Sequence, residues 1–439
     1  MAKKQPDPTL PDWWQREKQR RQLMFLIFLG LLLTLIAYHY KVSNDGIIGS
    51  VRGINFDSKN YVAFVHQEKD GNVSLYAVRA DGTDTRRLTS ASDISNKQDP
   101  AWTLDGKRLL YSTNKNDKQV MQIYIMGDGE TKQLTYGAGN KFVPLASPDA
   151  KTIAFVTQGA IKTVLLNGED VQQALPPPRA GNSSEGEGAN LGETELRGPF
   201  LAPNFSSDGR GLASVQSLSA EDNPEDITKY GEQVARAVFP NTGYAEILSP
   251  GREVGLTWEP VGDRLACAFT EFQQARPTPA APLPPLVSGI TLWKPNPAAK
   301  ANEPKATQTP LFIASGFVVE PLNPVWSPDG KTIAFECWRL KSEGIRESLG
   351  LVLWPADKTN VQITAADIVN LPFIIKASPA GRPQLPRWAP DGSRLLFEVV
   401  KPDGLRDLCL INTDGTNQTI LTQSLGGDNS QGAWGPGRK

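Results

Sequence analysis

The chain has 439 residues, and its 46 Lys and Arg stand against 47 Asp and Glu, for a formal net charge of -1. This balance provides no basic field of the kind that attracts nucleic acid, so nucleic acid is not expected as a partner. The 39 Gly and 35 Pro are typical of short strands joined by tight turns. Two His and three Cys leave few groups for metal or proton chemistry. The composition predicts an all-β protein.

An uncharged apolar segment, LMFLIFLGLLLTLIAY, occupies residues 23–38, and His39 and Tyr40 extend it to residues 23–40. Eleven of its residues are Leu, Ile or Phe, which together favour bilayer insertion by about 3 to 7 kcal/mol. A cleaved signal peptide is the alternative, but residues 34–44 contain no small-x-small cleavage site. The segment predicts one uncleaved transmembrane helix over residues 23–40.

Basic residues gather before this segment, whereas only Lys41 and Arg52 closely follow it. The positive-inside rule therefore places residues 1–22 in the cytoplasm, at the inner membrane. Everything after Tyr40, including the linker at residues 41–50, is then expected in the periplasm or outside the cell. Trp13 and Trp14 are either aromatic anchors or a docking site for another membrane subunit. The predicted membrane-interface anchors are Trp13, Trp14, Arg16, Arg20, Arg21, Tyr38 and Tyr40.

After residue 50 one pattern recurs: a short strand ending in Trp, a Ser-Pro-Asp-Gly turn, and a β-rich strand. The clearest copies are NPVWSPDGKTIAFE from Asn323 and LPRWAPDGSRLLFE from Leu385, and weaker ones begin at Asp99, Val143, Ala202 and Gly255. Pro presets φ, Asp bonds the local backbone and Gly accepts a positive φ, so the pattern predicts a hairpin. The residues that define the repeat are Trp102, Trp258, Trp326, Asp329, Trp388, Asp391 and Trp434.

A second Asp-Gly hairpin follows the better copies, as in LYAVRADGTDTRRLT from Leu75. Two hairpins per repeat predict four strands per repeat, which is the composition of a propeller blade. The repeats predict seven blades, with six or eight as alternatives. Trp434 repeats the opening of the pattern near the C-terminus, so the last strand is expected to complete the first blade and close the ring.

These repeats resemble the WD40-like repeats of TolB-type β-propellers, the periplasmic component of the Tol-Pal envelope system. The resemblance covers nearly all of the chain after residue 50 and implies a propeller over residues 51–439. Proteins built this way include protein-binding envelope components and the propeller halves of prolyl oligopeptidase-like peptidases. The anchor and an additional blade depart from TolB, so the partners of TolB are not carried over.

Catalytic constellations are scarce in this sequence. A prolyl oligopeptidase needs Gly-x-Ser-x-Gly and a downstream His, and neither is present. His66 is the single His of the expected propeller and is interpreted as an ordinary strand residue, because a lone His forms no metal site. Cys267, Cys337 and Cys409 are expected to be core residues, with a disulfide pair left open. No metal and no cofactor are predicted.

Carboxylates are harder to exclude, because glycosidase chemistry needs only two of them. The visible acidic stretches are SSEGEG from Ser183 and EDNPED over residues 221–226. Both lie beside Gly, Asn or Pro and are interpreted as solvated loops. Neither matches a calcium-binding loop.

Four insertions interrupt the repeats. Residues 176–199 and 274–285 are rich in Pro, Gly or Ala and are expected to be linkers or wrapping arms. Residues 223–238 predict a short amphipathic helix outside the blades, and residues 368–375, IVNLPFII, are expected outside both hairpins of their blade and form a docking patch if exposed. The partner-binding candidates on these two insertions are Ile227, Tyr230, Val234, Leu371, Phe373 and Ile374.

Together these features predict a noncatalytic protein–protein interaction module, an accessory subunit of a larger membrane or envelope complex. Its expected partners are the bilayer and other membrane or envelope proteins. The alternative is an envelope enzyme that processes carbohydrate or peptide, or a sensor that binds an unidentified small ligand in the propeller channel.

Overall fold

The structure is a computed structural model. It describes residues 60–116, 119–127, 129–175, 200, 202–217, 233–239, 244–249, 252–272, 286–296, 298–299, 303, 306–316, 319–340 and 345–435. These residues form strands almost throughout, as the composition predicts, with one 3-10 helix, η3 (Ala365–Asn370), between two of the strands. No helix in these ranges is long and apolar enough to cross a bilayer. The predicted anchor over residues 23–40 lies outside them.

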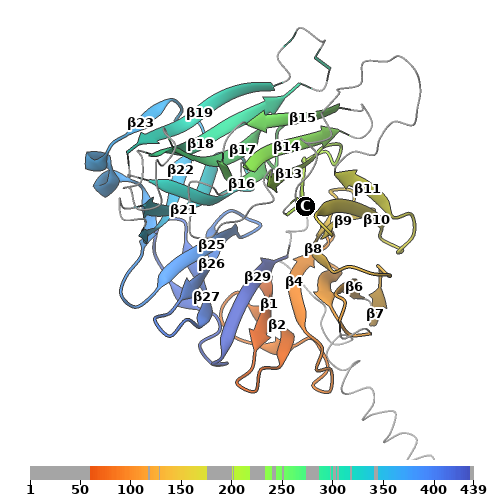
Figure 1. Ribbon diagram of the computed structural model, residues 1–439. Coiled ribbons are helices and arrows are strands. Elements are labelled where there is room, and N and C mark those ends of the chain that lie inside the picture. The colour runs from red at the N-terminus through yellow and green to blue at the C-terminus, as the bar shows by residue number, and fades with distance from the viewer. Residues whose placement is uncertain are drawn as a thin grey trace, which may run out of the picture.

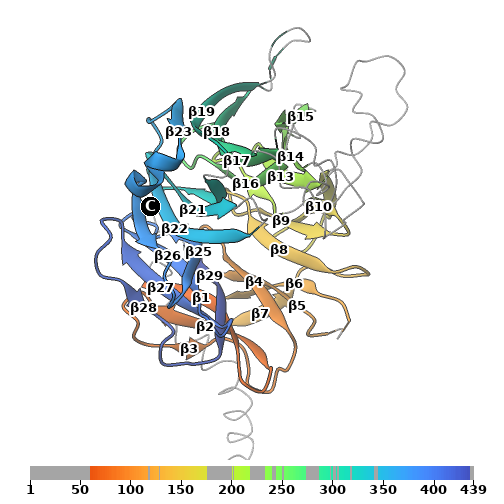
Figure 2. The same cartoon turned by 60° about the vertical axis from the view of Figure 1, so that its left-hand side comes forward.

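The strands group into antiparallel sheets of four, arranged around an axis (Figures 1 and 2). Blade 1 has the order β29 (Asp428–Trp434), β1 (Tyr61–Gln67), β2 (Val73–Arg79) and β3 (Arg86–Arg87). Blade 2 contains β4 (Lys97–Trp102), β5 (Leu109–Thr113), β6 (Gln122–Gly127) and β7 (Glu130–Gln133). Blade 3 contains β8 (Lys141–Ala146), β9 (Thr152–Thr157), β10 (Ala160–Leu165) and β11 (Gln172–Leu175).

Blades 4 and 5 are joined. Blade 4 contains β12 (Asn204–Phe205), β13 (Leu212–Ser217), β14 (Gln233–Phe239) and β15 (Tyr244–Ser249). Blade 5 contains β16 (Arg252–Trp258), β17 (Leu265–Phe272), β18 (Leu286–Pro295) and β19 (Ala306–Ser315). A single parallel pairing, Gln233 with Arg252, connects the two into one path of strands.

Blade 6 contains β20 (Glu320–Trp326), β21 (Thr332–Leu340), β22 (Arg346–Pro355) and β24 (Phe373–Lys376). Blade 7 contains β25 (Arg382–Trp388), β26 (Arg394–Val400), β27 (Arg406–Asn412) and β28 (Thr419–Ile420). Within the described ranges the strands thus make seven blades, in agreement with the seven repeat units of the sequence.

The ring closes where the two ends of the propeller meet. The C-terminal strand β29 pairs antiparallel with β1, with Val62 opposite Trp434 and Gln67 opposite Asp428. Figure 1 shows the blue β29 beside the orange β1. The strand that the sequence left without a blade therefore completes blade 1 and covers its inner edge.

The hydrophobic core is divided among the interfaces between neighbouring blades. Leu75 of blade 1 packs in one cluster with Trp102 and Tyr111 of blade 2, and Phe64 of blade 1 packs in another with Leu396 and Leu408 of blade 7. Each sheet buries both faces against its neighbours, which explains why its central strands are apolar on both sides. The tryptophans of the repeat add polar contacts, because the indoles of Trp102 and Trp326 donate to the carbonyls of Ala433 and Thr257 in the preceding blade, at 3.1 and 3.2 Å.

The turn of the repeat has the predicted local bonding. Ser327 Oγ donates to Asp329 Oδ1 at 2.6 Å, and the main-chain N–H of Lys331 donates to the same oxygen at 3.1 Å. These hydrogen bonds lower the pKa of Asp329. Asp391 accepts from the N–H and Oγ of Ser393 at 2.9 and 2.7 Å in the same way.

Blade 5 keeps this turn without its aspartate. Where the blade 6 copy has Ser327 and Asp329, this one has Glu259 and Val261. The Glu259 carboxylate accepts from Arg264 Nε and Nη2 at 2.9 and 2.6 Å. A Cβ at Gly262 would clash with that carboxylate. The Arg264 guanidinium lies 5.2 Å from the ring centroid of Trp326 in blade 6, so the ion pair also contacts the next blade.

Two expectations about insertions are wrong. The expected helix over residues 223–238 is not formed in its second half, because residues 233–239 form β14 and Val234 pairs with Gln216 of β13. Backbone pairing with an otherwise open strand edge overrides the helical spacing there. Ile227 and Tyr230 lie outside the described residues.

The segment at residues 368–375 is also not outside its blade. Residues 368–370 are the last residues of η3. Residues 373–375 belong to β24, which pairs with β22. Leu371 is buried, and Phe373 packs against the core of blades 5 and 6. Ile374 is half-buried against the core of blade 7. The condition for a docking patch, exposure of this apolar segment, is therefore not met by Leu371.

The chain just before this segment links blades 5 and 6. Its strand β23 (Val361–Ile363) pairs in parallel with β19, the outer strand of blade 5. Phe312 of β19 lies 4.9 Å from Trp354 of blade 6, ring centroid to ring centroid. The apolar residues that suggested a partner surface thus bury one blade against the next.

Candidate functional site

A cavity of about 860 Å³ lies on the axis of the propeller. Its wall is formed by the inner strands β4, β8, β12, β16, β20, β25 and β29, one from each blade, with contributions from β13, β26 and β27. Most of the lining residues are apolar, and prolines recur among them: Pro100, Pro144, Pro203 and Pro324. Concave sites of this size, apolar with a few polar groups, are where small ligands bind in proteins.

The inner strands have a bulge before the tryptophan position, and there the residue preceding the Pro or Gly has a left-handed backbone. Its φ is +54° at Asp99, +51° at Val143, +48° at Asn323, +52° at Leu385 and +55° at Gln431. The register of each strand shifts at this point. The bulge turns a main-chain N–H toward the neighbouring blade.

Side chains of the preceding blades accept these N–H groups. Asp99 N donates to Gln431 Oε1 at 2.6 Å, and Val143 N donates to Asp99 Oδ2 at 3.0 Å. Across the ring, Leu385 N donates to Glu336 Oε1 at 2.8 Å, and Gln431 N donates to Glu398 Oε1 at 2.6 Å. The acidic and amide side chains near the axis thus hold neighbouring blades together.

The carboxylates at the axis have further partners. Glu336 also accepts from Asn323 Nδ2 at 2.7 Å and from Trp338 Nε1 at 2.9 Å. Glu398, which is almost fully buried, accepts from Gln384 Nε2 at 3.2 Å. Burial raises the pKa of Asp99, against the hydrogen bonds from Val143 and Ser112 that lower it. These groups are occupied as hydrogen-bond acceptors within the fold.

Arg387 differs from the rest of the lining. Within the described part of the chain its single hydrogen bond runs from Nη1 to the carbonyl of its own neighbour Pro386, at 3.0 Å, and it forms no ion pair within 4 Å there. The side chain is exposed on the side of the cavity. Desolvation by the protein packed around the inner strand lowers its pKa, while Glu398 and Glu336 act to raise it. An arginine remains charged despite such a shift.

Arg387 is not among the residues predicted from the sequence, although the repeats contain a signal for it. The residue just before the tryptophan position lines the cavity in each blade, and it is uncharged in the other six: Ala101, Leu145, Asn204, Thr257, Val325 and Ala433. Comparison of the repeats with one another shows Arg387 as the exception. That it faces the axis is information that only the structure provides.

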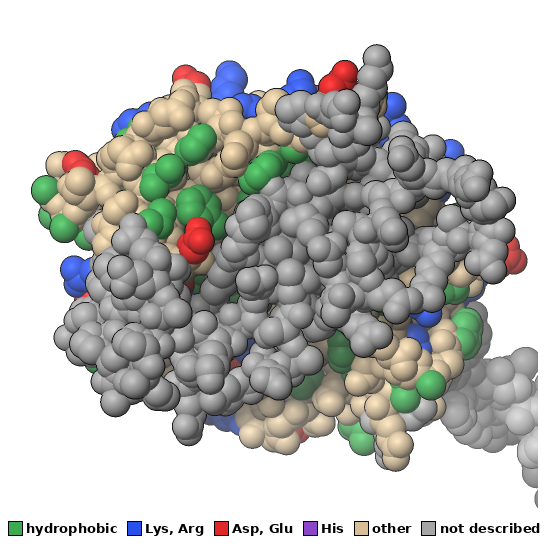
Figure 3. Space-filling model, turned by 45° about the horizontal axis from the view of Figure 1, so that its top comes forward, with side chains coloured by type: hydrophobic (Ala, Val, Ile, Leu, Met, Phe, Trp, Pro, Cys, Tyr) green, Lys and Arg blue, Asp and Glu red, His purple; other side chains and the backbone are tan. Residues whose placement is uncertain are grey.

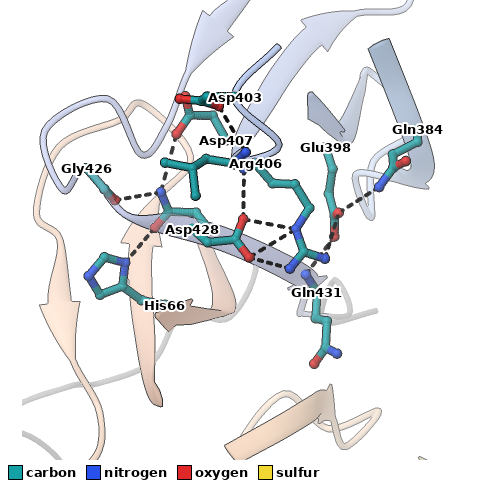
Figure 4. A network of polar contacts seen from close by, with 11 residues as sticks. His66, Gln384, Glu398, Asp403, Arg406, Asp407, Gly426, Asp428 and Gln431 are labelled. Atoms are coloured by element: carbon teal, nitrogen blue, oxygen red, sulfur yellow. Dashed lines mark hydrogen bonds and ion pairs between the residues drawn. The ribbon is translucent and has the colours of Figure 1, made fainter. Parts of the chain in front are cut away.

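A polar network secures the closing strand next to this cavity (Figure 4). Arg406 of blade 7 pairs with Asp428 of β29 through Nε at 3.0 Å and through Nη2, and its main-chain N–H donates to Asp428 Oδ1 at 2.8 Å. Burial acts to raise the pKa of Asp428, but the bonds from Arg406 outweigh it and the pKa is lowered. Glu398 lies 4.0 Å from Arg406 Nη1.

His66 belongs to the same closure. Its Nδ1 lies 2.8 Å from Asn429 Oδ1 on β29, and its ring meets Tyr76 edge-on at 5.0 Å. Asn429 Nδ2 in turn donates to the carbonyl of Gly426 at 3.1 Å. The interpretation of His66 as a strand residue agrees with this buried, hydrogen-bonded place.

The three cysteines are buried, and no disulfide joins them. Burial raises the pKa of Cys337 to about 12 and that of Cys409 to about 12. The pairing that the sequence left open is therefore not formed. Among the described residues no group of three or more His, Cys, Asp or Glu is placed to hold a metal ion.

The remaining predicted residues divide into two sets. The tryptophans and aspartates of the repeat stand at the ends of inner strands and in their turns, as expected. The predicted membrane-interface residues lie outside the described ranges: Trp13, Trp14, Arg16, Arg20, Arg21, Tyr38 and Tyr40.

No protein-family model and no curated protein matches the chain. Several solved structures do match the chain. An oligogalacturonate lyase in complex with manganese is 14% identical, with a TM-score of 0.50, over 82% of this chain and 83% of that one. A structure from an analysis of two prolyl endopeptidases is 12% identical, with a TM-score of 0.52, over 82% of this chain and 48% of that one. TolB from Acinetobacter baumannii is 15% identical, with a TM-score of 0.45, over 88% of this chain and 68% of that one.

The fold is that of a seven-bladed β-propeller. The propeller spans about half the length of the prolyl endopeptidase it matches. At these identities the likeness shows the fold alone, because propellers of one architecture carry both binding and catalytic functions.

Proposed function

We propose that this chain is a noncatalytic binding module, anchored in the inner membrane by residues 23–40, whose extracytoplasmic propeller engages other proteins. In this role it is an accessory subunit of a larger membrane or envelope complex. The apolar segment and the basic residues before it support the anchor and its orientation.

The observation that carries the noncatalytic assignment is the state of the axial acids. Glu336, Glu398 and Asp99 are the carboxylates a channel enzyme would use as acid, base or nucleophile. Each accepts a main-chain N–H of a neighbouring blade. A carboxylate that holds two blades together is poorly placed to exchange a proton with a substrate.

The surface of the propeller favours a protein partner that contacts several loops, and not one that binds a single apolar patch. The large exposed hydrophobic residues of the described ranges belong to different blades, among them Tyr136 at 68%, Val261 at 69% and Val369 at 74% exposure. On the face in Figure 3, the described hydrophobic side chains form separate small groups. Scattered apolar residues of this kind suit a wide, mostly polar interface on a rigid support.

Purification from native membranes tests the proposal. The chain carries a C-terminal tag and is extracted in mild detergent, and the bound proteins are identified by mass spectrometry while native sizing measures the assembly. We expect integral-membrane partners in stoichiometric amounts. An unrelated single-pass protein with the same tag is the control for detergent carry-over.

A monomer without bound protein in native membranes would contradict the proposal. It would move the assignment toward a sensor or an enzyme, for which the axial cavity is the site. Arg387 is the observation that favours ligand binding there.

A further inference from the structure

One position of the repeat faces the axis in every blade, and a single blade places a cation there. Arg387 occupies that position in blade 7, whereas the other blades have small, apolar or neutral residues. Because those blades form the same strands and bulges with neutral side chains, the fold does not require the guanidinium.

The blade interfaces do not use it either. Neighbouring blades are joined by Glu336 and Glu398, through bonds to Leu385 N and Gln431 N. Arg387 bonds only to Pro386 beside it within the described chain. A guanidinium presents a planar fork of several N–H donors, and most of this fork has no acceptor in the described protein.

The cavity leaves this charge accessible to a ligand. Arg387 is exposed although it lies on an inner strand, so its unused donors face the open space of the cavity, where a partner with good geometry would meet them. The nearest acids do not supply that partner, because Glu336 and Glu398 lie beyond ion-pair distance from Arg387 and accept bonds from other groups. Anions pair with a guanidinium in a bidentate manner, which matches the donors that remain.

The rest of the wall indicates what such an anion is attached to. Pro144, Leu145, Pro324 and Leu385 are among the apolar residues around the cavity. The acids of the lining, Asp99 and Glu398, would repel a ligand of high negative charge. The wall therefore suits a single anionic group on a small apolar body.

We propose that the axial cavity binds a small amphipathic monoanion, with its carboxylate or phosphate on the guanidinium of Arg387 and its apolar part against the proline- and leucine-lined wall. This site is independent of a protein partner on the outer surface. It assigns to the propeller a ligand of defined chemistry in addition to its proposed interaction role.

Calorimetric titration of the full chain, reconstituted in lipid nanodiscs, tests the site. The probes are 3-phenylpropionate, the singly charged diester methyl phenyl phosphate and the neutral 3-phenylpropanamide. We expect one of the two anions to bind saturably with one site per chain, and the amide to bind at least about tenfold more weakly, since loss of the charge removes a charge-assisted bidentate bond. The preferred anion identifies the head group.

Three variants make the test specific to Arg387. Arg387→Gln is expected to weaken binding of the anion at least about tenfold and to leave the amide unaffected. Arg387→Lys keeps the positive charge but not the planar fork. Its affinity for the anion is expected to lie between those of the unsubstituted protein and Arg387→Gln. Arg382→Gln is the matched control on the same strand, because Arg382 lies against Trp338, at 5.8 Å from its ring centroid, and does not line the cavity.

The proposal is overturned by absence of saturable binding for both anions, by equal affinity for acid and amide, or by unchanged affinity in Arg387→Gln. Thermal unfolding of each variant shows that it is folded. Should Arg387→Gln not fold, the comparison of Arg387→Lys with Arg382→Gln decides the outcome, because neither removes the hydrogen bonds by which Glu336 and Glu398 join the blades.

Discussion

The indole Nε1 of Trp388 donates a 3.0 Å hydrogen bond to the carbonyl of Val325, the residue just before Trp326 in the preceding blade. Trp326 makes the equivalent bond to the residue before Trp258. Trp326 and Trp388 are thus each hydrogen-bonded to the inner strand of the preceding blade, so the repeat joins these blades as well as turning the chain.

Removing this bond while keeping an aromatic ring should weaken the blade interface. Trp388→Phe is expected to lower the free energy of unfolding by about 1 kcal/mol, the usual net value of one hydrogen bond, with some further loss from the smaller ring. Urea unfolding measures it. Tyr136→Phe, at an exposed side chain, is the control and is expected to change stability by less than about 0.5 kcal/mol.

The turn of blade 5 offers a test of its substitute ion pair. Arg264→Gln leaves the buried Glu259 carboxylate without its bidentate partner and is expected to cost about 1 to 3 kcal/mol in urea unfolding. The triple variant Glu259→Ser, Val261→Asp and Arg264→Thr gives this turn the Ser, Asp and Thr of the blade 6 copy and should recover most of that loss. Failure of the triple variant to recover stability would show that Arg264 acts mainly through Trp326.

The pair Arg406–Asp428 should make ring closure sensitive to acid. The folded pKa of Asp428 is lowered, so its stabilising effect is complete above the ordinary carboxyl pKa and is lost as the pH falls through the folded value. Asp428→Asn is expected to lower the free energy of unfolding by about 2 kcal/mol at neutral pH, and the difference from the unsubstituted protein should vanish in acid.

Stability curves at several pH values measure this effect. Asp403→Asn, at an exposed turn of the same blade, is the control. A difference between Asp428→Asn and the unsubstituted protein that persists unchanged in acid would argue against the ion pair as its source.

The insertion of blade 6 contains a matched pair of positions. Val369 is 74% exposed, whereas Leu371, two residues later, is 9% exposed within the core of blades 5 and 6. Val369→Asp is expected to leave thermal unfolding nearly unchanged. Leu371→Asp buries an unpaired carboxylate and should cost several kcal/mol or prevent folding. Equal tolerance of both would mean that this segment does not pack as described.

The repeats determined the architecture because the bonds that form each turn join residues close together in the sequence. The turn bonds of Asp329 and Asp391 span two residues, so residue types in order were enough to predict hairpins, four-stranded blades and closure by the final strand. Residues 223–238 show the limit of local reasoning, since a helical spacing there gave way to pairing of β14 with β13.

Only the tertiary structure decided the contacts between residues that lie far apart in the sequence. The Glu336 carboxylate meets a main-chain N–H 49 residues away, and this bond commits one axial acid to the blade interfaces. Whether Leu371 faced solvent or the core depended on β23 reaching blade 5. That Arg387 faces an apolar axial cavity followed only from placing seven inner strands around one axis, because a side chain's partners are set by the strands beside it and not by its neighbours along the chain.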